Sequence, residues 1–411
     1  MRPVGYNSCM IMRIALVASV LTMVPCRLEP APFRQSVPAG FTETLLDATL
    51  ARPVALVFTP DGRLLIGEQY TGIIKIYKNG AVQSTPFATV SPVYTGDNET
   101  GLLGLCIDPN FGSNGYVYVF VTQSSSVQRI LRYTAVGDTG TSPVTLVDNL
   151  PTLGINHNGG GIRFGPDGYL YAVVGENGSA ASDAQVVASM RGKVLRFDAS
   201  TVPASIPATN PFASNPVYSF GHRHPFRLTW RPTTGALYVS ENGPGTDDEI
   251  NVITPGANYG WPNDTGPNTN ASYTDPVFTF TATIAITDLL FYTGSTIPYV
   301  GDLFYVDYNN GRIRRLQVNP ASEQITGGPF DFVTGLNQPV DLEQGPDGAL
   351  YYTTLTGNLY MAQSDGSVIP PPGGNPSSGD SSGGGRCGLL GVEALLIAGL
   401  ATLLRRAIRR R

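Results

Sequence analysis

The 411-residue sequence has few charged side chains and few cysteines. Lys, Arg, Asp and Glu together make up 14% of it, the formal net charge is −5, and no long basic run occurs in the body of the chain. Binding to nucleic acid phosphates needs concentrated basic side chains, so nucleic acid is not expected as a partner. Of the four cysteines only Cys106 lies in the body, which excludes a disulfide inside a folded domain. The hydrophobic core must therefore hold the fold together.

Long helical patterns are also missing from the body of the chain. No stretch keeps a helical period for more than about two turns, and the density of Pro and Gly argues against a hidden helix. In contrast, Gly (48), Pro (33) and Tyr (20) are plentiful. This composition suits many short strands joined by tight turns and predicts an all-β fold.

A recurring element runs through residues 40–363: a turn built on Pro-Asp-Gly or a relative, then a strand of apolar and aromatic residues. The copies start about 45 to 70 residues apart. They lie at 59–68, 108–122, 165–176, 231–241, 301–308 and 345–354, with further period-two strands such as 73–78 and 312–318 between them. Repeats of this length are typical of radial folds in which each four-stranded blade covers its neighbour. We predict a six-bladed β-propeller over residues 40–363, with a two-sheet sandwich as the alternative.

The N-terminal end has the composition of a targeting segment. Arg13 precedes the apolar run 14–24, which is typical of a secretory signal peptide, and we predict a signal segment over residues 1–32. Cleavage is expected near residues 26–32. Lipidation at Cys26 is the alternative, disfavoured because Pro25 stands where a small residue is needed.

The C-terminal end indicates membrane association. Residues 364–386 form a Pro/Gly/Ser-rich linker, and residues 387–411 combine an apolar stretch with a terminal arginine cluster. This order resembles bacterial C-terminal sorting signals, with processing or lipid attachment near Cys387; a plain tail anchor is the alternative. We expect an exported protein, periplasmic, secreted or at the cell surface, that contacts the membrane through this segment.

The three histidines lie in two short polar motifs. His157 stands in the glycine-rich loop 156–161, where backbone can approach a ligand, although a structural hydrogen-bonding role is the alternative. His222 and His224 flank Arg223. The planar Arg223 cation could hold a carboxylate or stabilise an oxyanion, or instead form a salt bridge between blades.

An oxygen-rich segment, 241–251, is followed by the Gly-, Asn- and aromatic-containing segment 256–262. Carbonyls freed by Gly and Pro beside carboxylates are the ligands that Ca²⁺ prefers. The ligand spacing of an EF-hand is missing, and a solvated acidic turn is the alternative.

Six strings resemble the soluble glucose/sorbosone dehydrogenase family, in order and over about residues 40–363: GLLGLCIDPNFGSNGYVYVF, HNGGGIRFGPDGYLY, GKVLRFD, GHRHPF, ENGPGTDDEIN and PGANYGWP. Members of this family, which include aldose sugar dehydrogenases, carry pyrroloquinoline quinone (PQQ) on a six-bladed propeller. The resemblance implies oxidation of an aldose sugar or related polyol by hydride transfer to the quinone, with a separate electron acceptor as partner.

The resemblance also implies roles for residues at the cofactor. His157 would be the general base that takes the hydroxyl proton, and Arg223 would assist at the quinone. The carbonyls of Gly243 and Pro244 would hold the Ca²⁺ that polarises the quinone.

A second calcium is implied by two later positions. Glu249 and Tyr259 correspond to residues that bind a structural calcium in some members of the family. This assignment comes from the resemblance alone.

Several positions depart from the dehydrogenase pattern where the cofactor would be held. Glu99 replaces a glutamine and puts a carboxylate beside an anionic cofactor, while His224 replaces an asparagine. The lysine expected near Asn309 is absent, and residues 339–341 stand where an arginine pair would meet the cofactor's carboxylates. These segments are more similar to the branch that includes Hedgehog-interacting protein.

Two functions therefore stay open. The retained His157, Arg223 and Gly243-Pro244 pair favour a PQQ- and calcium-dependent oxidoreductase. The missing cations favour a non-catalytic propeller that binds carbohydrate or protein at the cell surface.

Overall fold

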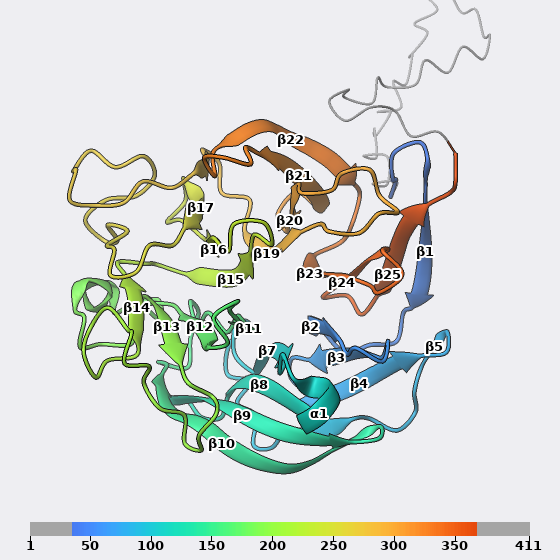
Figure 1. The fold of residues 1–411 in the computed structure, drawn as a ribbon, viewed down its shortest axis with the longest axis horizontal. Helices are drawn as coiled ribbons and strands as arrows, with labels where there is room; N and C mark the ends of the chain where they lie inside the picture. The colour runs from blue at the N-terminus through green and yellow to red at the C-terminus, as the bar shows by residue number, and fades with distance from the viewer. Residues whose placement is uncertain (1–34, 368–411) are drawn as a thin grey trace, which may run out of the picture.

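A computed structural model describes residues 35–367, which form six antiparallel sheets arranged around a central axis (Figure 1). Each sheet is one blade. Blade 1 contains β2 (Pro53–Phe58), β3 (Leu64–Glu68), β4 (Ile73–Lys78), β5 (Ala81–Val82) and β6 (Ala88–Thr89), and blade 2 contains β7 (Leu102–Ile107), β8 (Tyr116–Thr122), β9 (Val127–Val136) and β10 (Thr139–Pro151). Blade 3 contains β11 (Ile162–Phe164), β12 (Leu170–Val174), β13 (Lys193–Phe197) and β14 (Val217–Phe220).

The remaining blades follow in chain order. Blade 4 contains β15 (Pro225–Trp230), β16 (Leu237–Glu241), β17 (Asp248–Val252) and β18 (Phe278–Phe280). Blade 5 contains β19 (Ile286–Phe291), β20 (Leu303–Asp307), β21 (Arg312–Val318) and β22 (Ile325–Val333). Blade 6 contains β23 (Pro339–Gln344), β24 (Leu350–Thr354), β25 (Leu359–Ser364) and, as its outer strand, β1 (Phe41–Asp47).

The ring is closed by strands from the two ends of the described chain. The N-terminal strand β1 pairs antiparallel with the C-terminal strand β25, with Phe41 opposite Ser364 (Figure 1). The first strands of the blades, β2, β7, β11, β15, β19 and β23, each contact the first strands of both neighbouring blades. The six-bladed β-propeller predicted from the repeats is therefore confirmed, and the alternative of a two-sheet sandwich is wrong.

The repeats found in the sequence correspond to the second strand of each blade and the turn before it. The second strands β3, β12, β16, β20 and β24 are buried along their whole length. Burial on both faces explains their nearly continuous apolar and aromatic composition. The core is divided between neighbouring blades: one cluster joins Tyr118 and Phe120 of blade 2 to Leu170 of blade 3. The predicted strands 73–78 and 312–318 are the third strands β4 and β21.

The Pro-Asp-Gly turns have a local structural reason. Gly168 and Gly348 both have a φ of 79°, a left-handed conformation that glycine adopts without steric cost. The preceding aspartates, Asp167 and Asp347, each accept a hydrogen bond of 2.8 Å from a tyrosine hydroxyl of the following strand. The turn motif and the tyrosine four residues later therefore act together to fix the start of the second strand.

Helices contribute little to the described part of the chain. It contains one short α-helix, α1 (Phe111–Asn114), and one 3₁₀ helix, η1 (Ala181–Gln185). Within residues 35–367 no helix has the length and apolar character needed to cross a membrane. The predicted signal segment (1–32), the linker from residue 368 onward and the C-terminal segment (387–411) lie outside the described residues. Cys106 is a buried free thiol.

Candidate functional site

A cavity of about 330 Å³ lies on the propeller axis, at the end where the first strand of each blade begins. In four blades its lining comes from two equivalent positions, the residue before the first strand and the residue after the second. In each pair the second residue donates its backbone N–H to the carbonyl of the first. The pairs are Arg52 and Gln69 (3.0 Å), His224 and Asn242 (3.1 Å), Ala285 and Tyr308 (3.2 Å), and Gln338 and Leu355 (2.9 Å).

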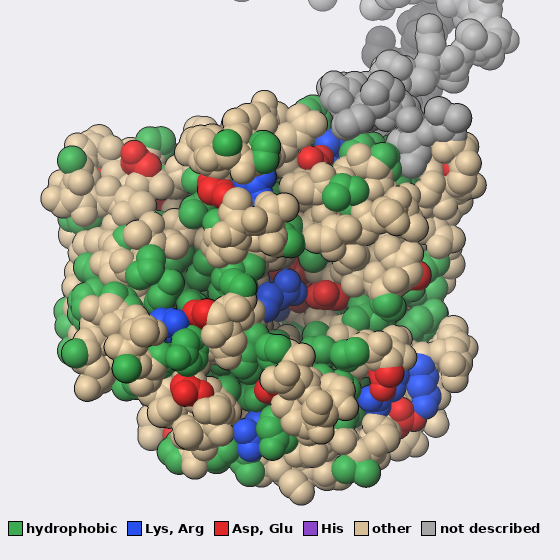
Figure 2. Space-filling model, in the orientation of Figure 1, with side chains coloured by type: hydrophobic (Ala, Val, Ile, Leu, Met, Phe, Trp, Pro, Cys, Tyr) green, Lys and Arg blue, Asp and Glu red, His purple; other side chains and the backbone are tan. Residues whose placement is uncertain are grey.

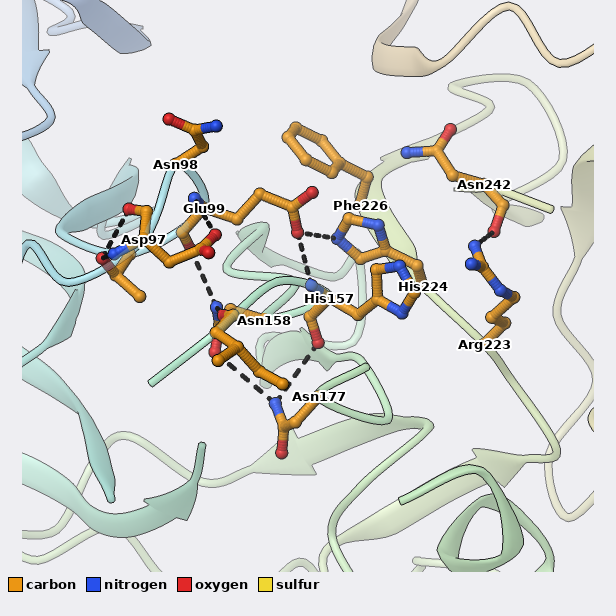
Figure 3. Close-up of polar contacts among 12 residues, drawn as sticks. Asp97, Asn98, Glu99, His157, Asn158, Asn177, Arg223, His224, Phe226 and Asn242 are labelled. Atoms are coloured by element: carbon orange, nitrogen blue, oxygen red, sulfur yellow. Dashed lines mark hydrogen bonds and ion pairs between the residues drawn. The ribbon is translucent and has the colours of Figure 1, made fainter. Parts of the chain in front are cut away.

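Loops of blades 2 and 3 complete the lining of this axial cavity. Glu99, from the loop before β7, lines it together with Gly159, from the loop before β11. The same loops bring Glu99 against His157, whose backbone N–H donates to the Glu99 carboxylate at 2.5 Å (Figure 3). The backbone of His157 is in the left-handed region, with a φ of 56°, which a residue other than glycine rarely adopts. The contact with Glu99 helps to fix it there.

The ring of His157 is oriented by a buried carboxylate. Its Nδ1 lies 2.6 Å from Oε1 of Glu176, and the side chain of Glu176 is almost fully buried. A carboxylate can only accept, so the proton sits on Nδ1 and the Nε2 lone pair is left free. The ring stacks on His224 with 4.9 Å between the centroids. His157 thus has the protonation pattern of a general base, although it lies behind His224 rather than in the wall of the axial cavity.

Glu99 and His224 face each other in the wall of the cavity (Figure 3). Nε2 of His224 lies 3.4 Å from Oε2 of Glu99 and, within the described residues, is a buried atom without a hydrogen-bond partner. Burial, with the charges of His157 and Arg223, lowers the pKa of His224 well below its ordinary value. Burial also raises the pKa of Glu99. Neutral His224 therefore presents an unsatisfied nitrogen to this cavity.

Arg223 lies on the other side of His224 and is attached to the oxygen-rich turn. Its guanidinium donates to the carbonyl of Asn242 at 2.7 Å (Figure 3) and to the carbonyl of Gly243 at 2.8 Å. Its backbone N–H donates to the carboxylate of Glu241. The carbonyl of Gly243, implied as a calcium ligand, is thus already in contact with a cation.

A second, narrow cavity lies next to Arg223 and has a volume of about 10 Å³, room for a single ion or water. Gly243, Glu249 and Tyr259 line it, together with acidic residues, a tryptophan and a threonine: Glu241, Asp247, Asp264, Trp261 and Thr265. Burial and the neighbouring Glu241 raise the pKa of Glu249 to about 8. This small cavity therefore has an excess of carboxylates over cations.

The ligands available in this second cavity are partly engaged. Glu249 accepts hydrogen bonds from Gly266 N–H (2.6 Å) and from the Asn251 amide (3.0 Å). The Tyr259 hydroxyl donates to the carbonyl of Val252 at 2.7 Å, so Tyr259 has its backbone carbonyl left as a ligand. In residues 35–367 no group of three or more His, Cys, Asp or Glu side chains is arranged to hold a metal. A cation here would rely on backbone carbonyls beside Glu249.

The structure divides the predicted site residues into two adjoining groups. Glu99 and His224 line the axial cavity with His157 behind them, whereas Arg223, Gly243, Glu249 and Tyr259 line the second cavity. Pro244 is exposed and lines neither.

Glutamates at the ends of three repeats received no individual role from the sequence, although Glu241 begins the oxygen-rich segment 241–251. Glu68, Glu176 and Glu241 end the repeats 59–68, 165–176 and 231–241, and all three are buried. Each contacts the loop that precedes the first strand of its own blade: Glu68 accepts from Ala51 N–H, Glu176 holds the His157 ring and Glu241 accepts from Arg223 N–H. Their recurrence at one position of the repeat was a signal available in the sequence.

The positions expected to carry a lysine and two arginines are neutral in the axial cavity. Tyr308 lines it just before Asn309, and Gln338 and Val340 line it at the start of blade 6. Asp341 does not face this cavity; it lies deeper on the axis, where its carboxylate is 3.3 Å from Arg227. The axial cavity therefore lacks the lysine and the arginine pair that the family pattern predicts. Asp341 does not add a negative charge to its wall.

Comparison with known proteins identifies the family. The family model described as Glucose / Sorbosone dehydrogenase matches residues 50–367. The chain belongs to this family. Among glucose/sorbosone dehydrogenase relatives, quinoprotein glucose dehydrogenase B of Acinetobacter calcoaceticus is 30% identical over 321 residues, covering 69% of this chain and 66% of that protein. The structure of the PQQ-bound aldose sugar dehydrogenase from Streptomyces coelicolor matches with a TM-score of 0.69 and 27% identity, covering 80% of this chain and 99% of that one.

The second branch of the family is also similar to this chain. Mouse (Mus musculus) Hedgehog-interacting protein is 32% identical over 191 residues, which cover 39% of this chain and 27% of that protein. The resemblances stated from the sequence motifs are therefore both confirmed.

Proposed function

We propose that this glucose/sorbosone dehydrogenase family member is an exported, PQQ- and Ca²⁺-dependent oxidoreductase that oxidises aldose sugars or related polyols. The observation that supports the proposal most directly is the pairing of His157 with Glu176 at 2.6 Å beside the axial cavity. A histidine whose Nδ1–H is held by a buried carboxylate is oriented for proton abstraction at Nε2.

The residues around the axial cavity fit an anionic cofactor. Nε2 of His224 is buried without a hydrogen-bond partner, and the guanidinium groups of Arg52 and Arg223 have no carboxylate within 4.0 Å among the described residues. His224 and Arg52 would hold PQQ in the axial cavity, with Arg223 in the adjoining second cavity, and PQQ when bound supplies an acceptor for two electrons.

The chain's own residues provide the proton chemistry. His157 would accept the proton of the substrate hydroxyl at Nε2 while Glu176 stabilises the imidazolium through Nδ1–H. The Glu99 carboxylate fixes the backbone of His157, and Arg223 stays anchored to the carbonyls of Asn242 and Gly243. These contacts hold the base in one orientation beside the cavity. Less entropy is therefore lost on reaching the transition state.

Purified protein supplied with PQQ and Ca²⁺ is expected to retain a quinone absorbance spectrum after gel filtration and to reduce an artificial electron acceptor when an aldose is added. The same sample without PQQ is the control. Absence of both signals at micromolar PQQ would contradict the proposed dehydrogenase.

Calcium is expected to stabilise the protein in a pH-dependent way. The pKa of Glu249 is raised to about 8 from an ordinary value of 4.5, so without metal the folded protein holds a proton there that the unfolded chain loses. Its contribution to stability therefore falls as the pH rises from about 4.5 to about 8. A cation must displace this proton, so the rise in Tm caused by Ca²⁺ should be larger at pH 8.5 than at pH 6.

Thermal unfolding of wild type and E249Q with and without Ca²⁺ checks this expectation. E249Q should lose most of the calcium-dependent rise in Tm and its pH dependence. A calcium response in E249Q equal to that of wild type would remove Glu249 from the calcium site.

One observation favours the alternative of a non-catalytic carbohydrate- or protein-binding propeller. Tyr308, next to the expected lysine position, Val340, within the expected arginine pair, and the neighbouring Gln338 leave this part of the cavity wall without positive charge. Under this alternative a sugar would bind without PQQ and no acceptor would be reduced. Calorimetric titration of PQQ-free protein with aldoses tests it.

A further inference from the structure

Arg52 occupies in blade 1 the position that His224 occupies in blade 4. Each residue precedes the proline that begins the first strand of its blade, and each carbonyl accepts the N–H of the residue after the second strand. In both blades the glutamate that ends the second strand accepts a hydrogen bond from the backbone N–H of the residue that precedes Arg52 or His224. Glu68 accepts from Ala51, and Glu241 accepts from Arg223. By this internal symmetry Arg52 stands at a position that the propeller uses to present a side chain to the axial cavity.

The backbone of Arg52 is fixed in an uncommon conformation. Its φ is 53°, in the left-handed region that residues other than glycine rarely adopt. The N–H of Gln69 donates to the Arg52 carbonyl at 3.0 Å, and the side-chain oxygen of Gln69 accepts from Nε of Arg52, also at 3.0 Å. The guanidinium carbon lies 4.5 Å from the centre of the Tyr70 ring. These contacts hold the guanidinium in place before any ligand arrives.

The charge of Arg52 is not neutralised by a protein carboxylate. Most arginines in residues 35–367 lie within 4.0 Å of an aspartate or glutamate; the exceptions are Arg52, Arg132 and Arg223. Arg227 also lines the axial cavity, but Asp341 is 3.3 Å away. Arg52 is therefore the uncompensated arginine in the described wall of the cavity.

The electrostatic effect of Arg52 reaches the position where the expected lysine is missing. Burial raises the pKa of Tyr308, and the charge of Arg52 opposes that rise. Tyr308 and Arg52 line the same cavity, as do the neutral Gln338 and Val340. The positive charge available to an anion in this cavity therefore comes from Arg52 of blade 1, and not from blades 5 and 6.

We propose that Arg52 is the carboxylate-binding residue of the axial cavity and replaces the lysine and arginine pair that this chain lacks. The inference rests on the proposed function, because it takes PQQ, a tricarboxylate, as the anionic ligand. A guanidinium with free N–H groups matches the geometry of a carboxylate and forms charge-assisted hydrogen bonds with it.

Equilibrium binding of PQQ and of its uncharged trimethyl ester tests the proposal, with calcium present throughout. The proteins are wild type, R52Q, R52K and the matched control R132Q, whose guanidinium lies over Tyr116 on an outer part of blade 2. R52Q should weaken PQQ binding by about tenfold to a hundredfold, the range for losing a hydrogen bond to a charged group. R52K should recover part of the loss, and R132Q should stay within about twofold of wild type.

The ester separates charge recognition from a structural role. Wild type should bind PQQ more tightly than the ester, whereas R52Q should bind the two with similar affinity. If R52Q instead weakens the binding of PQQ and of the ester equally, the substitution has distorted the cavity in general, and the proposal is overturned. Equal PQQ affinity in wild type and R52Q would overturn it while leaving the proposed function intact. Failure of wild type to bind PQQ at all would reject both.

Discussion

An H157A variant is expected to oxidise aldoses with a kcat lower by about 10²- to 10⁴-fold, the range for removal of a general base. The reason is that Nε2 of His157 is the nitrogen left free once Nδ1 donates to Glu176. Steady-state kinetics of the protein loaded with PQQ and calcium measures the loss. The affinity for PQQ should change much less, because His157 does not line the axial cavity.

A second variant tests the orientation of His157 rather than its presence. In E176Q the amide nitrogen can donate to Nδ1, which moves the proton of the imidazole to Nε2 and blocks proton abstraction. We expect a decrease in kcat of similar order to that of H157A, with a changed pH profile. The matched control is E323Q, which replaces a carboxylate that pairs with Arg231 away from the site; its activity should stay within about twofold of wild type.

H157A activity above about a tenth of wild type would contradict the assignment of His157 as the base.

Removal of Asp341 is expected to reduce the free energy of unfolding by about 1–3 kcal/mol, the cost of leaving a buried hydrogen-bonding group without its partner. In D341A, Arg227 would stay buried without its carboxylate, and the backbone N–H of Leu56 would lose its acceptor, now 3.2 Å away. The midpoint of chemical denaturation should fall accordingly. D148A, which removes a partly exposed ion pair with Arg129, should cost less than about 1 kcal/mol.

The large effect expected at Asp341 follows from its place between blades. Its carboxylate joins blade 6 to blade 1 through Leu56, and the carboxylate of Asp288 joins blade 5 to blade 6 through the N–H of Leu342 at 2.8 Å. Charged groups of both signs meet in the hollow at the centre of the ring in the view of Figure 2. A D341A protein as stable as D148A would show that β-strand pairing alone closes the propeller.

The overall architecture could be predicted from the sequence because its cause is local. A turn with a left-handed glycine, as at Gly168, followed by a strand buried on both faces leaves the same pattern in every blade. The turn needs glycine, and the strand buried on both faces needs apolar residues. Both signals therefore occur side by side in the sequence.

The wall of the axial cavity could be predicted only in part. His224 and Glu99 were found because they stand where the chain departs from the family's motifs, whereas Arg52, Tyr308 and Glu176 lie at the edges of repeats and carry no motif of their own. Their signal was positional: the residue before the first strand and the residues that end or follow the second strand recur from blade to blade. The glutamates that end three repeats were visible in the sequence, whereas the positions of Arg52 and Tyr308 could not be assigned without the strand boundaries.

The sequence by itself determined the class of fold, the number of blades and the groups able to do chemistry, because strand pattern and turn chemistry depend on neighbouring residues. Only the tertiary structure decided which of these groups meet. Closure of the ring brings Arg52 and Tyr308, far apart in the chain, to one cavity and turns Asp341 away from it toward Arg227. Whether a charge is free or neutralised depends on distances in space, and those are set by how the blades pack around the axis.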